Sequence, residues 1–126
     1  MIILKCLVEY KIYNNEEKIL KNNIKAVYND NKLSFRDDND SIKISINTDN
    51  IIMTKENLTS TITFNFIKDK KTEGKYFIKL LNSYVNMTIY TKVLEISTYR
   101  IYIEYEIWLE EEYSGIFKYE LIIKEM

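Results

Sequence analysis

Residues 101–109 read IYIEYEIWL, an alternation of apolar and polar side chains along one stretch of chain. Successive side chains of a β-strand point to opposite faces of the sheet, so this alternation predicts a strand with one face on a core and one in water. The same two-residue period returns at 42–47, 61–66, 85–90 and 117–124. Ile, Thr, Tyr and Phe, which recur at these positions, fit a pleated surface. The pattern predicts an all-β protein.

Short clusters of Asn, Asp, Ser and Gly separate these stretches, and such residues tolerate the backbone conformations of tight hairpin turns. They divide the chain into about ten expected strands: 2–13, 18–29, 32–37, 41–47, 51–55, 60–67, 75–81, 84–91, 93–97 together with 100–109, and 116–125. Residues 16–25, EEKILKNNIK, also fit a short helix. We favour a strand there, because Ile24, Ala26 and Tyr28 resume the alternation.

The length of 126 residues predicts a single domain, 1–126, that is large enough to bury a core. Nearly every expected strand has one apolar face. When a single antiparallel meander closes on itself, it buries such a face and leaves no edge strand with unpaired backbone groups. The sequence therefore predicts a closed β-barrel of about 8–10 strands.

The composition excludes several kinds of site. The chain has no His, one Cys, two Gly and no Pro, and its net charge is −1. These counts argue against His-assisted nucleophiles, a disulfide, cysteine metal knuckles and glycine-rich phosphate loops. The near-neutral charge argues against nucleic acid and against an anionic membrane as partners. We expect no cofactor and no metal, and the oligomeric state stays open.

The first residues, 1–8, are apolar but lack the basic start and the cleavage site of a signal peptide. Cytoplasmic residence is the default expectation, with Cys6 reduced and buried as a small apolar side chain.

From Lys32 onward the chain resembles the YwiB-like family of small bacterial calycin-type β-barrels, a domain of unknown function. The resemblance rests on segments in a fixed order: 33–38 with its paired acids, 51–53, 76–83, 85–92 ending in Thr-Lys, 101–109 with Tyr105-Glu106, and 117–124. It implies a lipocalin-like barrel fold. It implies no activity, because none is established for the family.

Three groups of residues suggest chemistry, and each has a plainer interpretation. Glu104 and Glu106 share one strand face with Trp108, and some glycosidases use two neighbouring carboxyls in this way. We expect this face to be exposed to solvent, however, and its glutamates to form ion pairs with lysines of the neighbouring strand. The run 37–40, DDND, lacks the glycine and spacing of a calcium loop. Tyr99, Arg100 and Tyr102 interleave aromatic rings with a cation, but the surrounding strand is acidic. The sequence predicts no catalytic residue and favours binding over catalysis.

Two functions stay open. The first is binding of a small apolar or amphipathic ligand inside the barrel. The lining expected for it comprises Phe35, Asp37, Phe64, Met87, Ile89, Thr91, Tyr105 and Tyr119. Asp37 belongs to this set because it shares its strand face with Leu33 and Phe35. The second is a protein–protein interaction module with a solid core and an outer patch around Trp108, Tyr102 and Ile116.

The alternation also predicts which side chains are buried and how the last hairpin pairs. We expect one face to be buried, namely Ile42, Ile44, Ile46, Ile62, Phe64, Ile103, Tyr105, Leu121 and Ile123. We expect the other to be exposed, namely Lys43, Thr63, Glu104, Glu106, Lys118 and Lys124. A five-residue loop would place Ile107 opposite Phe117, Tyr105 opposite Tyr119 and Glu106 opposite Lys118.

Overall fold

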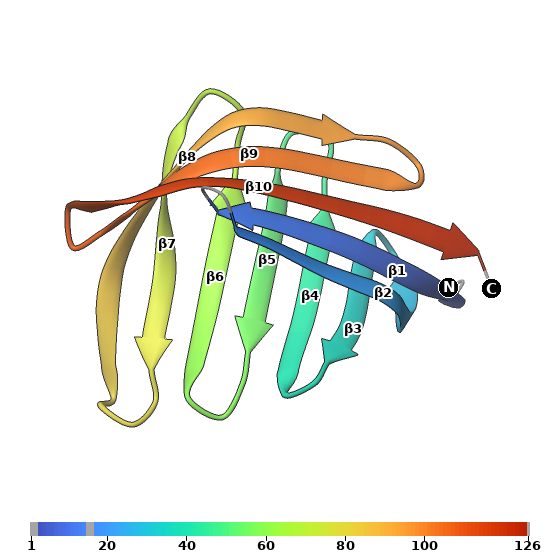
Figure 1. Cartoon of the computed structure of the whole chain (residues 1–126), viewed down its shortest axis with the longest axis horizontal. Coiled ribbons are helices and arrows are strands. Elements are labelled where there is room, and N and C mark those ends of the chain that lie inside the picture. Colours follow the sequence, from blue (N-terminus) through green and yellow to red (C-terminus); the bar gives the residue numbers. More distant parts are fainter. Residues whose placement is uncertain (1–2, 15–16, 126) are drawn as a thin grey trace.

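The structure is a computed structural model that describes residues 3–14 and 17–125. Within these residues ten antiparallel strands form a closed barrel. Each strand pairs with its neighbours in sequence, and β1 closes the barrel by pairing with β10 as well as with β2 (Figure 1). The predicted fold class, an antiparallel meander closed into a barrel, is confirmed.

The strands have these bounds: β1 Ile3–Asn14, β2 Glu17–Asn29, β3 Lys32–Asp37, β4 Asp40–Ile46, β5 Ile51–Glu56, β6 Ser60–Phe66, β7 Lys71–Ile78, β8 Ser83–Ile96, β9 Arg100–Leu109 and β10 Glu112–Glu125. The ambiguous segment is a strand from Glu17 onward, as favoured. Residue 2, where the first strand was expected to begin, and residues 15–16, between the first two expected strands, lie outside the described residues.

Three strand boundaries were predicted wrongly. Residues 93–96 belong to β8 and not to the strand that contains Arg100. β7 begins at Lys71 and therefore contains Gly74, which the sequence placed in a turn. β10 begins at Glu112, four residues before the expected start. β7 and β10 continue through glycine and serine, which commonly mark turns, because neighbouring strands pair with both segments there.

The barrel is formed by two groups of strands that cross at a steep angle. β3 to β7 run roughly vertically in Figure 1, whereas β1, β2, β9 and β10 run across them. The long strand β8 belongs to both groups, and its pairing with β9 shifts register between Thr91 and Val93. Such a bulge increases the local twist and bends a strand. The bulge accounts for the way β8 turns from one group into the other.

The last hairpin confirms the face prediction and corrects the register. Tyr105 pairs with Phe117, Ile103 with Tyr119 and Glu104 with Lys118, so odd residues face odd residues as expected. Each pairing is displaced by two residues because the turn is shorter than predicted. Glu110 and Glu111 both have positive φ and form a two-residue turn, typical of a type I′ hairpin. A bulge between Tyr113 and Gly115 then brings odd residues opposite odd residues, and Gly115 at this bulge has a positive φ of 124°, which glycine adopts without strain.

The core runs through the whole barrel and follows the predicted face. Of the nine residues expected to be buried, Ile42, Ile44, Ile103, Tyr105 and Leu121 are buried, and the other four pack half-buried against the core. Thr63, Glu104 and Glu106 are half-buried and not exposed as predicted. Lysines on the outer face shield the two glutamates, since Nζ of Lys92 lies 2.8 Å from Glu106 and Nζ of Lys118 lies 3.5 Å from Glu104.

Gly74 allows a close approach at the core. An added Cβ at Gly74 would lie 2.9 Å from the carbonyl oxygen of Thr63 and 2.2 Å from Cε of Met87. The backbone oxygen cannot move as easily as the methionine tip, so a side chain here would separate β6 from β7.

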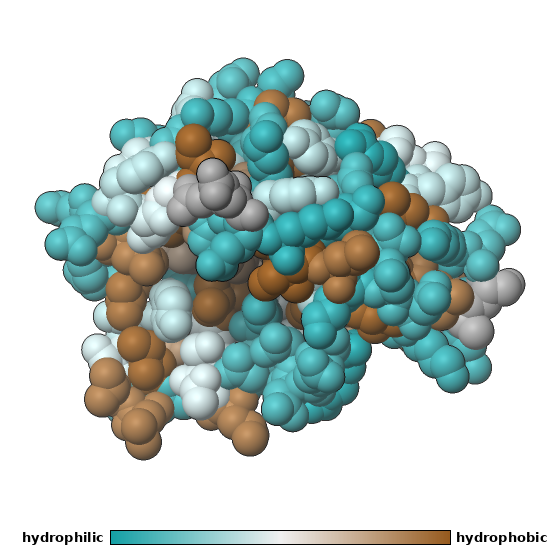
Figure 2. Space-filling view, viewed as in Figure 1, coloured by the Kyte–Doolittle hydropathy of each residue, from teal (hydrophilic) through white to brown (hydrophobic). Residues whose placement is uncertain are grey.

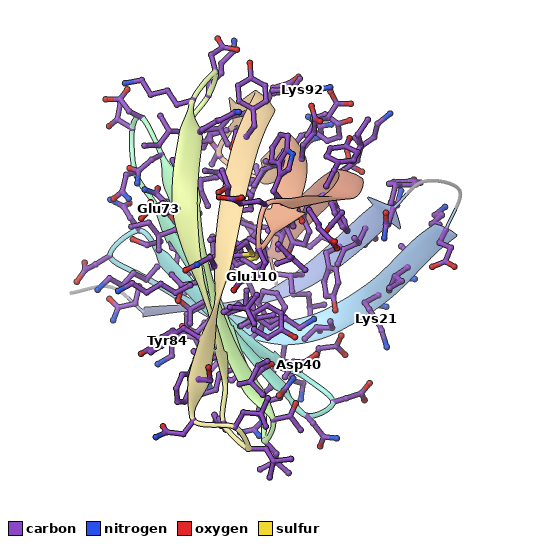
Figure 3. The ribbon with its side chains drawn as sticks, turned by 90° about the vertical axis from the view of Figure 1, so that its left-hand side faces the viewer. Lys21, Asp40, Glu73, Tyr84, Lys92 and Glu110 are labelled. Atoms are coloured by element: carbon purple, nitrogen blue, oxygen red, sulfur yellow. The ribbon has the colours of Figure 1, made fainter. Side chains whose placement is uncertain are left out.

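Apolar side chains gather at one end of the molecule, at the lower left of Figure 2, around the turns that follow β5 and β7. Leu58, Leu80 and Leu81 are strongly exposed there, and Tyr84 lies at the base of β8 (Figure 3). Lys79 ties the two turns together, because its Nζ lies 2.7 Å from the carbonyl oxygen of Asn57.

Candidate functional site

The eight side chains predicted to line a cavity lie in the barrel interior and at its rim. Six are buried and belong to the packed interior, namely Phe35, Met87, Ile89, Thr91, Tyr105 and Tyr119. Phe64 and Asp37 are half-buried. As contacts of a ligand, all eight stay a prediction.

Aromatic rings pack against one another across this interior. Tyr10 on β1 stacks on Tyr119 at a centroid distance of 5.8 Å and lies 6.0 Å from Phe35. Tyr105 contacts Phe66 at 4.8 Å and stacks on Phe117 at 5.4 Å. These contacts fill the middle of the barrel with side chains from β1, β3, β6, β9 and β10, which is how a small barrel buries its interior.

A polar pair lies at the edge of this aromatic cluster. The Tyr10 hydroxyl donates a hydrogen bond to Oδ2 of Asp37, and Nζ of Lys21 lies 3.9 Å from the other carboxylate oxygen. Lys21 lies on β2 and Asp40 at the start of β4 (Figure 3), and both are close to this pair. Burial raises the pKa of Tyr10, and the hydrogen bond to Asp37 raises it further. The sequence correctly placed Asp37 inward but did not identify its partner.

Two buried hydroxyls have no hydrogen-bond partner among the described residues: Tyr119 Oη and Thr91 Oγ1. Burial raises the pKa of Tyr119 well above its usual value, and the neighbouring hydroxyls of Tyr10 and Tyr105 raise it further. Burial also raises the pKa of Tyr105. All three phenols are therefore neutral at physiological pH.

Tyr10 and Tyr119 form a matched pair for mutation to Phe. Tyr10→Phe removes the hydroxyl that donates a hydrogen bond to Asp37. The half-buried Asp37 carboxylate then lacks this hydrogen bond, so we expect a loss of about 1–3 kcal/mol in the free energy of unfolding. Tyr119→Phe removes a hydroxyl that has no partner, so we expect a change within about 0.5 kcal/mol. Urea unfolding monitored by circular dichroism measures both. A larger loss for Tyr119→Phe than for Tyr10→Phe would contradict this assignment.

A pocket of about 680 Å³ opens at one end of the barrel. Its walls come from the start of β1, the ends of β2, β4 and β10, and the turn between β8 and β9. The apolar part of the lining consists of Leu4, Cys6, Tyr28, Ile46, Ile96 and Ile123, with the ring of Tyr99. We call this space the mouth pocket. In Figure 1 the start of β1, the ends of β2 and β10 and the turn between β8 and β9, which contribute to its walls, lie at the right-hand side.

Polar groups also line the mouth pocket. Lys5 and Glu125 contribute one charge of each sign, and Ser97 and Thr98 contribute hydroxyls. The Tyr99 hydroxyl donates a hydrogen bond of 3.0 Å to Oε1 of Glu125. The Cys6 thiol is buried, and burial raises its pKa, so it stays protonated and unreactive at neutral pH. The pocket lining is therefore chemically amphipathic.

Fully buried apolar side chains lie next to the mouth pocket. They are Val8, Leu33, Ile44, Ile101 and Leu121, each at most 2% exposed. Val8, Ile44 and Leu121 are one inward-facing position along their strands from Cys6, Ile46 and Ile123 of the pocket, whereas Leu33 and Ile101 pair with Tyr28 and Ile96. The sequence analysis missed the pocket because it is assembled from strand ends and a turn. One signal was present: Leu4, Ile46, Ile96 and Ile123 continue the inward alternation beyond the part of the barrel that the core fills.

The outer patch proposed around Trp108 is partly covered. Trp108 packs edge-on against Tyr113 at 5.4 Å, and Nζ of Lys71 lies 5.1 Å from its ring centroid. Tyr102 donates a hydrogen bond of 2.8 Å to Oε1 of Glu104, and burial together with this bond raises its pKa to about 12. Of the three patch residues, Ile116 is exposed.

The two glutamates considered for catalysis form ion pairs on this outer face. Glu104 lies 3.5 Å from Nζ of Lys118, and Glu106 lies 2.8 Å from Nζ of Lys92. The bond to Lys92 lowers the pKa of Glu106. Glu106 is therefore not held protonated as a general acid would be.

A search of solved structures finds a similar fold. The chain superposes on the crystal structure of the ywiB protein from Bacillus subtilis with a TM-score of 0.66 and 11% sequence identity. The match covers 98% of this chain and 92% of that one. At this identity the similarity shows the fold, a barrel of the same architecture over nearly the whole chain. No protein-family model and no curated protein matches the sequence.

The part of the chain that the structure describes contains no helix long and apolar enough to cross a membrane.

Proposed function

We propose that this protein binds a small amphipathic molecule in the mouth pocket. The observation that carries the proposal is the pocket itself: about 680 Å³ of space at an end of the barrel, lined by apolar side chains together with a few polar ones. Small-molecule sites in proteins have volumes of about 300–1,000 Å³, mostly apolar linings and a few polar groups. The mouth pocket has all three properties.

The lining restricts the chemistry of the ligand. Leu4, Ile46, Ile96 and Ile123 favour an apolar body, because covering them removes apolar surface from water. The lining offers Lys5 to a negatively charged group, and it offers the Ser97 and Thr98 hydroxyls to a neutral polar group. Glu125 is already hydrogen-bonded by Tyr99. A molecule with an apolar chain or ring and one polar or anionic end fits best.

Binding of 11-(dansylamino)undecanoic acid, a fluorescent amphiphile, tests the proposal. We expect saturable binding with one site and a micromolar Kd. Ile96→Trp puts an indole into the mouth pocket and is expected to weaken binding at least about tenfold, because the probe and the indole compete for the same volume. Fluorescence titration of wild type and variant measures the effect.

Ile116→Trp is the matched control, since Ile116 is 41% exposed on the outer face of β10 and Ile96 is 37% exposed at the pocket. It adds the same aromatic surface elsewhere, and we expect wild-type affinity. Equal weakening by the two variants, or no saturable binding by the wild type, would count against the mouth pocket as the site.

A further inference from the structure

A second pocket, of about 550 Å³, lies where β2 and β3 separate. The two strands are paired from Ala26 opposite Phe35 to Asn29 opposite Lys32, although β2 begins at Glu17 and β3 continues to Asp37. The opening that follows is lined by Ala26, Val27, Ser34 and Phe35, with Ser41 on β4. We call this opening the β2–β3 seam.

Three basic side chains line the β2–β3 seam: Lys5 on β1, Lys25 on β2 and Arg36 on β3. Continuing the strand register by one residue would put Lys25 opposite Arg36, and like charges that face each other across a pair of strands destabilise it. The ladder ends at this position. The fold thus gathers positive charge at an opening between strands in a chain whose net charge is −1.

None of these three cations forms an ion pair with any described residue. The acidic groups near this end of β3 and β4 are already paired with other lysines. Asp37 and Asp38 lie within 4 Å of Lys21, and Asp40 lies 3.5 Å from Lys55. On β5, Glu56 lies 3.1 Å from Lys79. The positive charge of the seam is therefore not neutralised by neighbouring carboxylates.

From this arrangement we infer that the β2–β3 seam is a binding site for a phosphate group. Two lysines supply ammonium donors, Arg36 supplies a guanidinium that can hold two phosphate oxygens at once, and Ser34 and Ser41 supply hydroxyls. A phosphate ligand carries up to two negative charges, whereas a carboxylate ligand carries one. The phosphate therefore matches the positive charge of three cations more closely. Val27 and Phe35 provide apolar wall for the remainder of the molecule that bears the phosphate.

The inference is independent of the function proposed for the mouth pocket. Lys5 lines both pockets, but Lys25 and Arg36 line the seam and not the mouth pocket. Lys25→Gln and Arg36→Gln therefore test the seam, whereas Ile96→Trp tests the mouth pocket.

Isothermal titration calorimetry with inorganic pyrophosphate tests the seam as a site for free phosphates, and co-sedimentation with phosphatidylcholine vesicles with or without phosphatidic acid tests it as a site for lipid headgroups. We expect wild-type binding in one of the two assays, weakened about tenfold by Lys25→Gln and by Arg36→Gln, because each removes a charge-assisted hydrogen bond. Pyrophosphate binding identifies a free phosphate as the ligand, and vesicle binding that requires phosphatidic acid identifies a lipid headgroup.

Lys75→Gln is the control, because Lys75 is an exposed lysine on β7 that forms no ion pair with any described residue. It removes the same charge far from the seam and should leave binding unchanged. The inference fails if all three variants weaken binding equally, which indicates a general charge effect. It also fails if the wild type binds neither pyrophosphate at about 10 mM nor vesicles that contain phosphatidic acid.

Discussion

Raising the pH above 10 is expected to unfold this barrel steeply. Tyr10, Tyr105 and Tyr119 have pKa values raised by burial in the folded chain, whereas an unfolded tyrosine ionises near pH 10. Between these two values the unfolded state binds fewer protons, so the stability that is fully present below pH 10 is lost as the pH rises. In this range each of the three tyrosines lowers the free energy of unfolding by about 1.4 kcal/mol per pH unit. Together they lower it by about 4 kcal/mol per pH unit.

Circular dichroism across an alkaline titration measures the midpoint of this transition. Tyr119→Phe removes one of the three groups and should move the midpoint to higher pH. Tyr84→Phe removes a hydroxyl from a side chain that is 66% exposed and should leave the midpoint unchanged. If Tyr119→Phe has the same midpoint as the wild type, the buried phenols do not control alkaline stability.

Phe66→Ala is expected to cost about 3–5 kcal/mol in the free energy of unfolding. Phe66 at the end of β6 is fully buried and contacts the rings of Phe64 and Tyr105. Its removal leaves a cavity that the neighbouring strands cannot close, because the barrel fixes their spacing. A loss of this size is a large part of the total stability of a single domain.

Phe77→Ala is the matched control, since Phe77 is half-buried on β7 and its ring contacts Tyr84 at 4.8 Å. We expect a loss of about 1 kcal/mol or less, and urea unfolding compares the two variants. Equal losses would show that the middle of the barrel is not the close-packed core described here.

The strand alternation predicted the fold because one face of each strand must be hidden. Ile42, Ile44, Ile103 and Leu121 were assigned correctly on this basis alone. The register of the last hairpin was wrong by two residues, since alternation determines the face but not the position along it. The turn at Glu110 and Glu111 decides the position, and glutamate is not a residue that sequence patterns associate with positive φ.

The pockets were harder to predict than the fold because they depend on where strands stop pairing. Phe35 is buried among the aromatic rings and also forms a wall of the β2–β3 seam. In the sequence, Lys25 and Arg36 look like charged residues on the solvent-exposed faces of strands. They become neighbours around an opening because pairing between β2 and β3 ends at Ala26. No local pattern marks such an ending.

The central claim is that the ligand occupies the mouth pocket and not the barrel interior. The most direct measurement is the set of intermolecular nuclear Overhauser effects between bound 11-(dansylamino)undecanoic acid and the methyl groups of the protein. We predict contacts from the probe to Leu4, Ile46, Ile96 and Ile123, which line the mouth pocket. Contacts to Met87 and Ile89 in the interior, without contacts at the mouth, would contradict the account.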